Sequence, residues 1–184
     1  MNFISEDPLT LQLTTINIHD WSSLVQFIQQ LPYGRTANRT DLSLVISEQK
    51  GTCSSKHALL KRVAELNNIP DIQLVIGIYK MSEANTPGIG KALSNNGLTY
   101  IPEAHCYLKV KGVQTDYTAT DASFQKIQND ILEEIDIQPH QIAEYKVAYH
   151  KAYLKNWLKT NATNKTFDEL WAIREACIHN LSIS

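Results

Sequence analysis

Cys53 begins a segment whose apolar residues recur at helical spacing, and a thiol in that position can act as a nucleophile. The unpaired N–H groups and the positive dipole end of a helix N-terminus favour the thiolate, which lowers the pKa of a cysteine. Lys56 and His57, in the next turn, would act in the same direction if protonated. The alternative is a structural role, because free cysteine is among the most frequently buried residues.

A histidine and a carboxylate are expected beside each other on two neighbouring strands. If Lys111 and Gly112 form a two-residue turn, His105 and Asp116 share one face of the hairpin as diagonal neighbours. Their backbones would then lie roughly 7–8 Å apart, within reach of side chains. An imidazole oriented by a carboxylate is the base that a thiol nucleophile needs. A three-residue turn would instead place Asp116 on the opposite face, and a polar strand face is commonly the solvent face of a sheet.

The order of these residues resembles the transglutaminase-like superfamily, whose members are relatives of papain-like thiol enzymes. In that family a cysteine begins a helix, a strand follows an Ile-Pro bend, and a histidine strand pairs with a strand ending in Asp-x-Thr. Ile69 and Pro70 supply the bend here, and Asp116 and Thr118 the last element. The resemblance covers roughly residues 45–120, in the stretches GTCSSKHALLKRVAELNNIPDIQLVIGIY and AHCYLKVKGVQTDYT.

The resemblance implies a role for each member of this set. Cys53 would be the nucleophile, His105 its general base and acid, and Asp116 the group that orients the imidazole. The backbone N–H of Cys53 would stabilise the oxyanion of a tetrahedral intermediate. Two positions depart from the family, which often has an aromatic residue directly after the cysteine and Trp two residues after the histidine. This chain has Ser54 and Tyr107 there, which affects the expected substrate recognition more than the triad.

Two other interpretations use the same residues. The Asp-Cys-Ser-Gly motif of NlpC/P60-type cell-wall peptidases is a weaker likeness to the Thr-Cys-Ser-Ser sequence around Cys53. Cys53, His57, His105 and Cys106 together offer a possible zinc set, but Cys106 would point away from His105 on its strand. No Cys-x-x-Cys or His-x-x-x-His pattern is present, nor a calcium- or nucleotide-binding loop. We therefore expect no metal and no cofactor.

The candidate substrate-binding residues are Tyr33, Arg35 and Tyr107. Arg35 and Arg39 lie in a predicted loop, where a guanidinium can bind a carboxylate or phosphate or can simply be solvated. Tyr107 would share the strand face of His105.

Further charged residues allow more than one interpretation. Glu103 either tunes the pKa of His105 or lies at the strand edge. Asp121 is a second candidate for orienting the imidazole, or else caps a helix. Lysines line one face of a late helix, where we expect solvent exposure: Lys146, Lys151, Lys155 and Lys159.

The elements that would position these residues indicate an α+β domain. We expect a papain/transglutaminase-like core at about 20–120, in which the nucleophile-bearing helix packs on a small antiparallel sheet. A helical C-terminal extension would follow at about 121–184, within a single domain 1–184. The predicted helices are 21–31, 53–66, 139–158 and 167–178, the predicted strands are 72–81, 104–111 and 113–118, and a long loop covers 82–98.

Composition narrows the class of protein further. The 184 residues carry a net charge of −2, which argues against non-specific nucleic-acid binding. No apolar run is long enough for a membrane span, and acidic residues and a proline interrupt the N-terminal segment where a secretion signal would be apolar. The three cysteines do not form a disulfide framework, so we expect a cytoplasmic protein with free thiols.

These observations predict a cysteine-dependent enzyme that hydrolyses, or transfers the acyl group of, a peptide or a small amide or ester. The substrate, the choice between hydrolysis and transfer, and the oligomeric state are not encoded in the triad. The alternative from another class is a non-enzymatic binding or scaffold module on the same fold.

Overall fold

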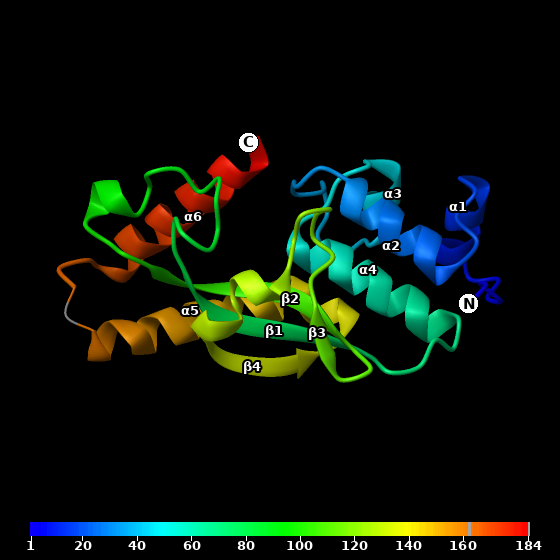
Figure 1. The fold of residues 1–184 in the computed structure, drawn as a ribbon. Coiled ribbons are helices and arrows are strands. Elements are labelled where there is room, and N and C mark those ends of the chain that lie inside the picture. Colours follow the sequence, from blue (N-terminus) through cyan, green and yellow to red (C-terminus); the bar gives the residue numbers. More distant parts are fainter. Residues whose placement is uncertain (162, 184) are drawn as a thin grey trace.

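Four antiparallel strands form the sheet at the centre of the computed structural model, which describes residues 1–161 and 163–183 (Figure 1). Their order across the sheet is β3-β2-β1-β4. The strands are β1 (Ile72–Met81), β2 (Ile101–Val110), β3 (Val113–Thr115) and β4 (Ile131–Ile137). Together with the flanking helices, this small sheet confirms the expected α+β class.

The helices form two groups in the ribbon. The first group precedes the sheet in sequence and consists of α1 (Pro8–Thr15), α2 (Trp21–Gln30), α3 (Ser43–Ser47) and α4 (Cys53–Leu66). The second group, α5 (Glu144–Thr160) and α6 (Phe167–Ile183), follows the last strand. Short 3-10 segments lie at Ser94–Asn96, Phe124–Lys126, Gln128–Asp130 and Pro139–Ile142.

The turn between β2 and β3 sets the register in which these two strands pair. Lys111 and Gly112 both have positive φ, 51° and 80°, as a two-residue hairpin turn with the twist of the flanking strands requires. Val110 pairs with Val113, so the expected register is confirmed. The strand is shorter than expected, however, because β3 ends at Thr115 rather than Thr118. β3 therefore pairs only with residues Leu108–Val110 of β2. Within the described ranges, the edge of β2 at Cys106 has no paired strand on that side.

The helical extension expected for residues 121–184 is wrong in part, because β4 extends the sheet on the far side of β1. Only Ile137 of this edge strand is buried, and the acidic residues Glu133, Glu134 and Asp136 lie between its isoleucines. A half-exposed edge strand has no long apolar run, so its sequence lacks the usual strand signal. The helix expected from Pro139 begins at Glu144, after the 3-10 turn Pro139–Ile142.

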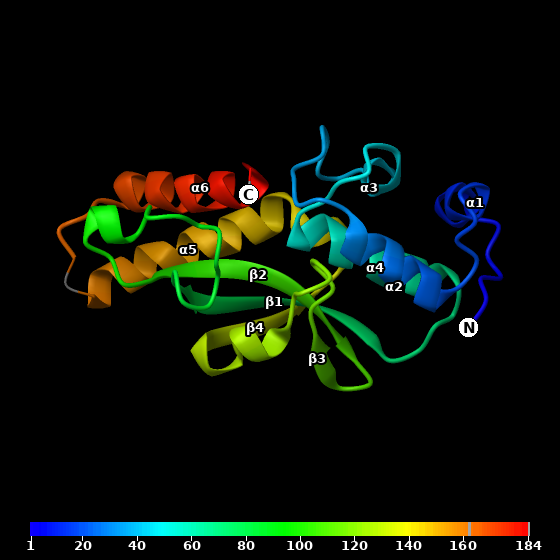
Figure 2. The same ribbon diagram turned by 45° about the horizontal axis from the view of Figure 1, so that its top comes forward.

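Figure 2 shows the two groups of helices beside the sheet, and two hydrophobic clusters hold them there. In the first, the apolar face of α4, with Leu59 and Leu60, packs against Ile76 of β1 together with α1–α3. In the second, α5 and α6 lie side by side and pack against Met81 and Ile101. The meeting of these two groups brings the start of α4 next to α5 and α6.

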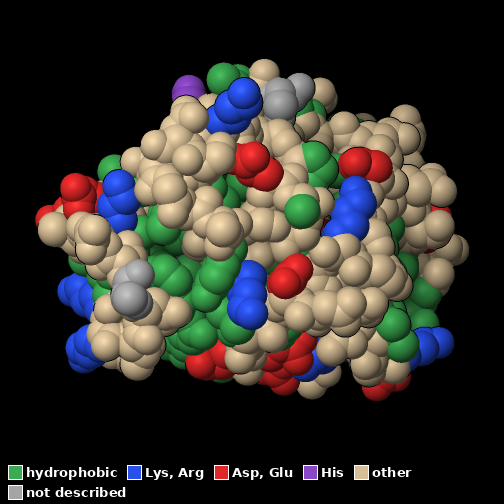
Figure 3. All heavy atoms as spheres, turned by 60° about the vertical axis from the view of Figure 1, so that its left-hand side comes forward, with side chains coloured by type: hydrophobic (Ala, Val, Ile, Leu, Met, Phe, Trp, Pro, Cys, Tyr) green, Lys and Arg blue, Asp and Glu red, His purple; other side chains and the backbone are tan. Residues whose placement is uncertain are grey.

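Figure 3 brings the left-hand end of Figure 1 forward and shows hydrophobic side chains exposed between Lys or Arg side chains. Lys151 Nζ lies 4.9 Å from the ring centroid of Trp171, and Lys155 Nζ lies 5.0 Å from that of Phe167. These two members of the expected lysine stripe therefore pack over aromatic rings. Among the described residues, no helix has the length and apolar character needed to cross a membrane.

Candidate active site

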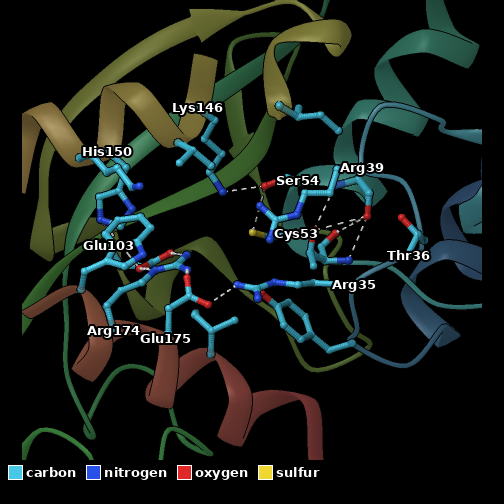
Figure 4. Close-up of a pocket in the computed structure, with 18 residues that line it drawn as sticks. Arg35, Thr36, Arg39, Cys53, Ser54, Glu103, Lys146, His150, Arg174 and Glu175 are labelled. Atoms are coloured by element: carbon cyan, nitrogen blue, oxygen red, sulfur yellow. Dashed lines mark hydrogen bonds and ion pairs between the residues drawn. The ribbon is translucent and has the colours of Figure 1, made fainter. Parts of the chain in front are cut away.

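Cys53 is the first residue of α4 and lines a cavity of about 350 Å³ (Figure 4). The helix starts here because Thr52 and Ser55 cap each other: the Thr52 side chain accepts from the Ser55 N–H, and the Ser55 side chain accepts from the Thr52 N–H. The side chain of Cys53 is buried, with only 6% of its surface exposed, yet it faces the cavity. A substrate in the cavity would therefore meet the sulfur at a helix N-terminus.

His105 and Asp116 form a close pair next to this helix. The His105 Nε2 lies 2.8 Å from Asp116 Oδ2. The other carboxylate oxygen accepts hydrogen bonds from the Thr118 hydroxyl at 2.6 Å and the Thr118 N–H at 2.9 Å. Thr118 thus fixes the carboxylate, and the carboxylate fixes the imidazole. Because Nε2 is occupied by Asp116, Nδ1 is the ring nitrogen left to interact with Cys53.

The charges around Cys53 favour the thiolate. Burial alone would raise the pKa of Cys53, but the cations Lys146 and His105 outweigh it and lower this pKa to about 6. Burial would likewise lower the pKa of His105, whereas Asp116 and Cys53 raise it well above its usual value. At neutral pH the site therefore holds a thiolate beside an imidazolium, the form of a thiol nucleophile with its proton donor.

The free edge of β2 supplies a second contact to the sulfur. In an antiparallel hairpin closed by Val110 and Val113, every second residue of β2 directs its backbone groups toward the β3 side. Cys106 is one of these residues, and β3 has already ended at its level. Its backbone N–H interacts with Cys53 and lowers the pKa of the thiol further. The shortness of β3 thus leaves a backbone donor of β2 free to contact the Cys53 sulfur.

His57 is a structural residue in this arrangement. It is fully buried; its Nδ1 lies 2.8 Å from the Cys53 carbonyl oxygen, and its Nε2 accepts a hydrogen bond from the Tyr117 N–H at 2.8 Å. Burial lowers the pKa of His57 to about 4, so it is neutral at pH 7 and does not stabilise the thiolate as a cation. Its role is to tie α4 to the segment that carries Asp116.

Lys56 makes a comparable link between two loops. Its Nζ donates to the carbonyl oxygens of Leu31 at 2.5 Å and Thr118 at 2.6 Å. Burial lowers the pKa of Lys56 to about 8. This side chain joins the end of α2 to the Asp-x-Thr segment, which keeps Asp116 in place.

The expectation that Lys146 lies on an exposed helix face is wrong. It is buried, and its Nζ donates to Ser54 Oγ at 2.6 Å (Figure 4). Burial would lower the pKa of Lys146, but the nearby thiols Cys106 and Cys53, together with Glu103, raise it. The sequence contains no local sign of this role, because only the packing of α5 against the start of α4 brings the ammonium to the site.

A buried ion pair borders the cavity on the side of α6. Arg174 binds Glu103 through two nitrogens, at 2.7 and 2.5 Å, and donates to Glu175 at 2.6 Å. Burial would raise the pKa of Glu103, but Arg174 lowers it to about 2. Glu103 was expected to tune His105 or to lie at the strand edge; its side chain instead joins β2 to α6. Sequence reasoning missed Arg174, which lies far from the motif in the chain.

The candidate substrate-binding residues have different surroundings. Tyr33 and Arg35 line the cavity, and Arg35 pairs with Glu175 at 2.7 Å. Tyr107 does not line this cavity; its ring stacks on His105 at a centroid distance of 6.1 Å, and its hydroxyl donates to Glu134. Gly77 makes room for this ring, since a Cβ there would lie 2.7 Å from it. Tyr107 therefore packs against one face of the His105 imidazole.

Asp121, the second candidate for orienting the imidazole, lies away from the histidine. Its side chain is 84% exposed and lies 3.5 Å from Lys126 Nζ. Within the part of the chain that the structure describes, no group of three or more His, Cys, Asp or Glu side chains is arranged to hold a metal ion.

Comparisons of the chain with models of known protein families, with curated proteins and with solved structures each found no match. The geometry of the site is therefore the basis for a proposal about function.

Proposed function

We propose that the protein is a cysteine-dependent enzyme that hydrolyses, or transfers the acyl group of, an amide or ester. The observation that carries this proposal is the placement of Cys53, with its pKa lowered to about 6, beside the His105–Asp116 pair and at a cavity. A purely structural cysteine has no need of an oriented imidazole or of a path to solvent.

In the first step the Cys53 thiolate attacks the carbonyl carbon, and the carbonyl oxygen becomes an oxyanion. Backbone N–H groups at the start of α4 are suited to stabilise that charge. As the C–N or C–O bond breaks, the imidazolium of His105 gives its proton to the leaving amine or alcohol. The products are a free amine or alcohol and a thioester on Cys53.

In the second step water, or an acceptor amine, attacks the thioester. Neutral His105 takes the proton of the attacking group, and the thiolate leaves. Asp116 stabilises the imidazolium each time it forms and keeps Nδ1 directed at the sulfur. Hydrolysis yields a carboxylic acid, transfer yields a new amide, and both restore the thiolate–imidazolium pair.

The proposal includes a papain/transglutaminase-like core for the part formed by α4, β1, β2 and β3. Support comes from the order nucleophile helix, strand, histidine strand and Asp-x-Thr segment, which the sheet brings together in space. All three cysteines are free thiols, which supports the proposal of a reducing, cytoplasmic compartment.

The test combines thiol reactivity with turnover. At pH 7 we expect iodoacetamide to label Cys53 at least about tenfold faster than Cys106 and Cys177, whose pKa values are raised by burial. Hydrolysis of a panel of peptide amides and esters should be lost in Cys53→Ala and kept in Cys177→Ala. Equal, slow labelling of all three cysteines without turnover would contradict the proposal and favour a non-enzymatic binding module.

A further inference from the structure

The cavity beside Cys53 is lined by more cations than anions. Its cationic side chains are Arg35, Arg39, Lys146, Lys151 and Arg174, and its acidic side chains are Glu103 and Glu175. The Cys53 thiolate adds one negative charge, while His105 and Asp116 balance each other. Two positive charges are therefore in excess around a space large enough for a small substrate.

Both carboxylates of the cavity already pair with arginines of the protein. Glu103 is held by two nitrogens of Arg174, and Glu175 accepts from Arg174 and from Arg35 (Figure 4). Neither carboxylate is left to neutralise another cation of the cavity. The burial of Glu103 and its pKa of about 2 show that this pairing is maintained across the physiological pH range.

Arg39 is the cation whose charge is not matched. Within residues 1–161 and 163–183 its guanidinium has no hydrogen bond and no ion pair, although it lines the cavity. Arg39 is exposed at the rim of the cavity; desolvation and the neighbouring cations Arg35 and Arg174 lower its pKa, while Glu175 raises it. Lys151, across the cavity on α5, lies over the ring of Trp171 and has no carboxylate partner among the same residues.

We infer that the cavity selects an acyl donor that carries a carboxylate, and that Arg39 binds this carboxylate while the scissile carbonyl faces Cys53. A planar guanidinium offers two parallel N–H donors to a carboxylate, and the charge excess favours the entry of an anion. The identification of the ligand as an acyl donor rests on the proposed function. The anion preference of the cavity rests only on its lining.

The anion preference is tested with a pair of alkylating agents that differ in charge. Iodoacetate and iodoacetamide alkylate the same sulfur but differ in charge. The ratio of their alkylation rates at Cys53 therefore reports the electrostatic potential in the cavity. Relative to the same ratio for free cysteine, we expect about a tenfold increase in favour of iodoacetate, reduced by added salt. Arg39→Gln should lower the ratio severalfold. Arg62→Gln, which changes an arginine of α4 outside the cavity, should leave it unchanged.

The acyl-donor assignment is tested with the glutaryl and pentanoyl amides of 7-amino-4-methylcoumarin, which have equal chain lengths but differ by one carboxylate. We expect wild type to hydrolyse the glutaryl amide with at least about tenfold higher kcat/KM, equivalent to about 1.4 kcal/mol. Arg39→Gln should lose most of this preference, and Arg62→Gln should retain it.

The outcomes separate the two proposals. Cys53-dependent hydrolysis of both amides with equal kcat/KM would overturn the acyl-donor inference and leave the enzymatic proposal standing. If Cys53 turns over neither these two amides nor the panel of peptide amides and esters while iodoacetate is still favoured, the enzymatic proposal and the acyl donor fail together, and an anion-binding cavity remains. A rate ratio equal to that of free cysteine would overturn the anion preference itself.

Discussion

The His105 ring lies 2.8 Å from the carboxylate of Asp116, although Asp116 follows the last paired residue of β3. The hairpin register brings the backbones near each other, and the Thr118 hydroxyl and N–H then turn the carboxylate toward the ring. The pair is thus held by a strand on one side and by a hydrogen-bonded loop on the other.

The alkylation rate of Cys53 should reach half of its plateau at an unusually low pH. Because its pKa is lowered to about 6, the thiolate is the main form above this pH. We expect the iodoacetamide rate at Cys53 to rise with pH and reach half of its plateau near pH 6, whereas a free cysteine reaches it near about pH 8.5. Labelling followed by peptide mapping between pH 5 and 9 measures this; a midpoint above 8 would contradict the assigned ion pair.

Asp116→Asn should weaken catalysis by removing the charge that holds the imidazolium. The pKa of His105 then falls, the pKa of Cys53 rises, and kcat/KM drops by about 100-fold or more. The matched control is Asp121→Asn, which changes an exposed carboxylate in the same connecting segment. The pH profile of alkylation should shift upward only in the first variant, and identical profiles would argue against an orienting role for Asp116.

Lys146→Met should also raise the pKa of Cys53, since it removes the buried cation that lowers this pKa most. We expect alkylation of Cys53 at pH 6.5 to slow severalfold, with a smaller effect at pH 9, where the thiolate forms without help. Lys159→Met changes an exposed lysine of the same helix and serves as the control. Circular dichroism melting should show that both variants are folded. If the alkylation rate of Lys146→Met depends on pH as that of wild type does, Lys146 has no electrostatic effect on Cys53.

His57 should make stability depend on pH in one direction. Its folded-state pKa of about 4 lies below the value of about 6.5 expected when unfolded, so the unfolded chain binds the proton first. The stability that neutral His57 contributes is complete above about pH 6.5 and is lost as the pH falls toward 4. Between pH 7 and 5 the free energy of unfolding of wild type should therefore fall by about 2 kcal/mol relative to His57→Gln, as measured by urea denaturation. A difference that stays constant with pH would contradict a buried neutral imidazole.

Glu103→Gln should destabilise the fold, because it removes the buried carboxylate that pairs with two nitrogens of Arg174 and leaves only the more exposed Glu175 as its partner. Loss of one partner of a buried ion pair costs about 3 kcal/mol or more in free energy of unfolding. The control Glu175→Gln, at a more exposed carboxylate, should cost clearly less. In the double variant Glu103→Leu with Arg174→Leu, the loss should be smaller than in Glu103→Gln. Urea denaturation checks all three, and equal effects of the two single variants would refute the distinction.

The sequence alone indicated the elements that carry Cys53, His105 and Asp116, because their signals are local. The apolar spacing after Thr52 predicts α4, the β-branched run predicts β1, and Lys111-Gly112 predicts the turn whose register brings His105 and Asp116 together. Each of these signals depends on neighbours within a few residues of the chain, where helix capping, strand periodicity and turn geometry act.

Only the tertiary structure decided what surrounds the sulfur. β4 was missed because an edge strand buries one side only, and Lys146 was assigned to solvent because a single helix does not show which face a distant element will cover. The same holds for the ion pair between Glu103 and Arg174, whose residues are 71 positions apart in the chain. Charge interactions in a cavity depend on distance in space and on burial, which the packing of α5 and α6 against α4 sets. The sequence therefore predicted a thiol, an imidazole and a carboxylate, and the fold gave them a buried cation and a positively charged cavity.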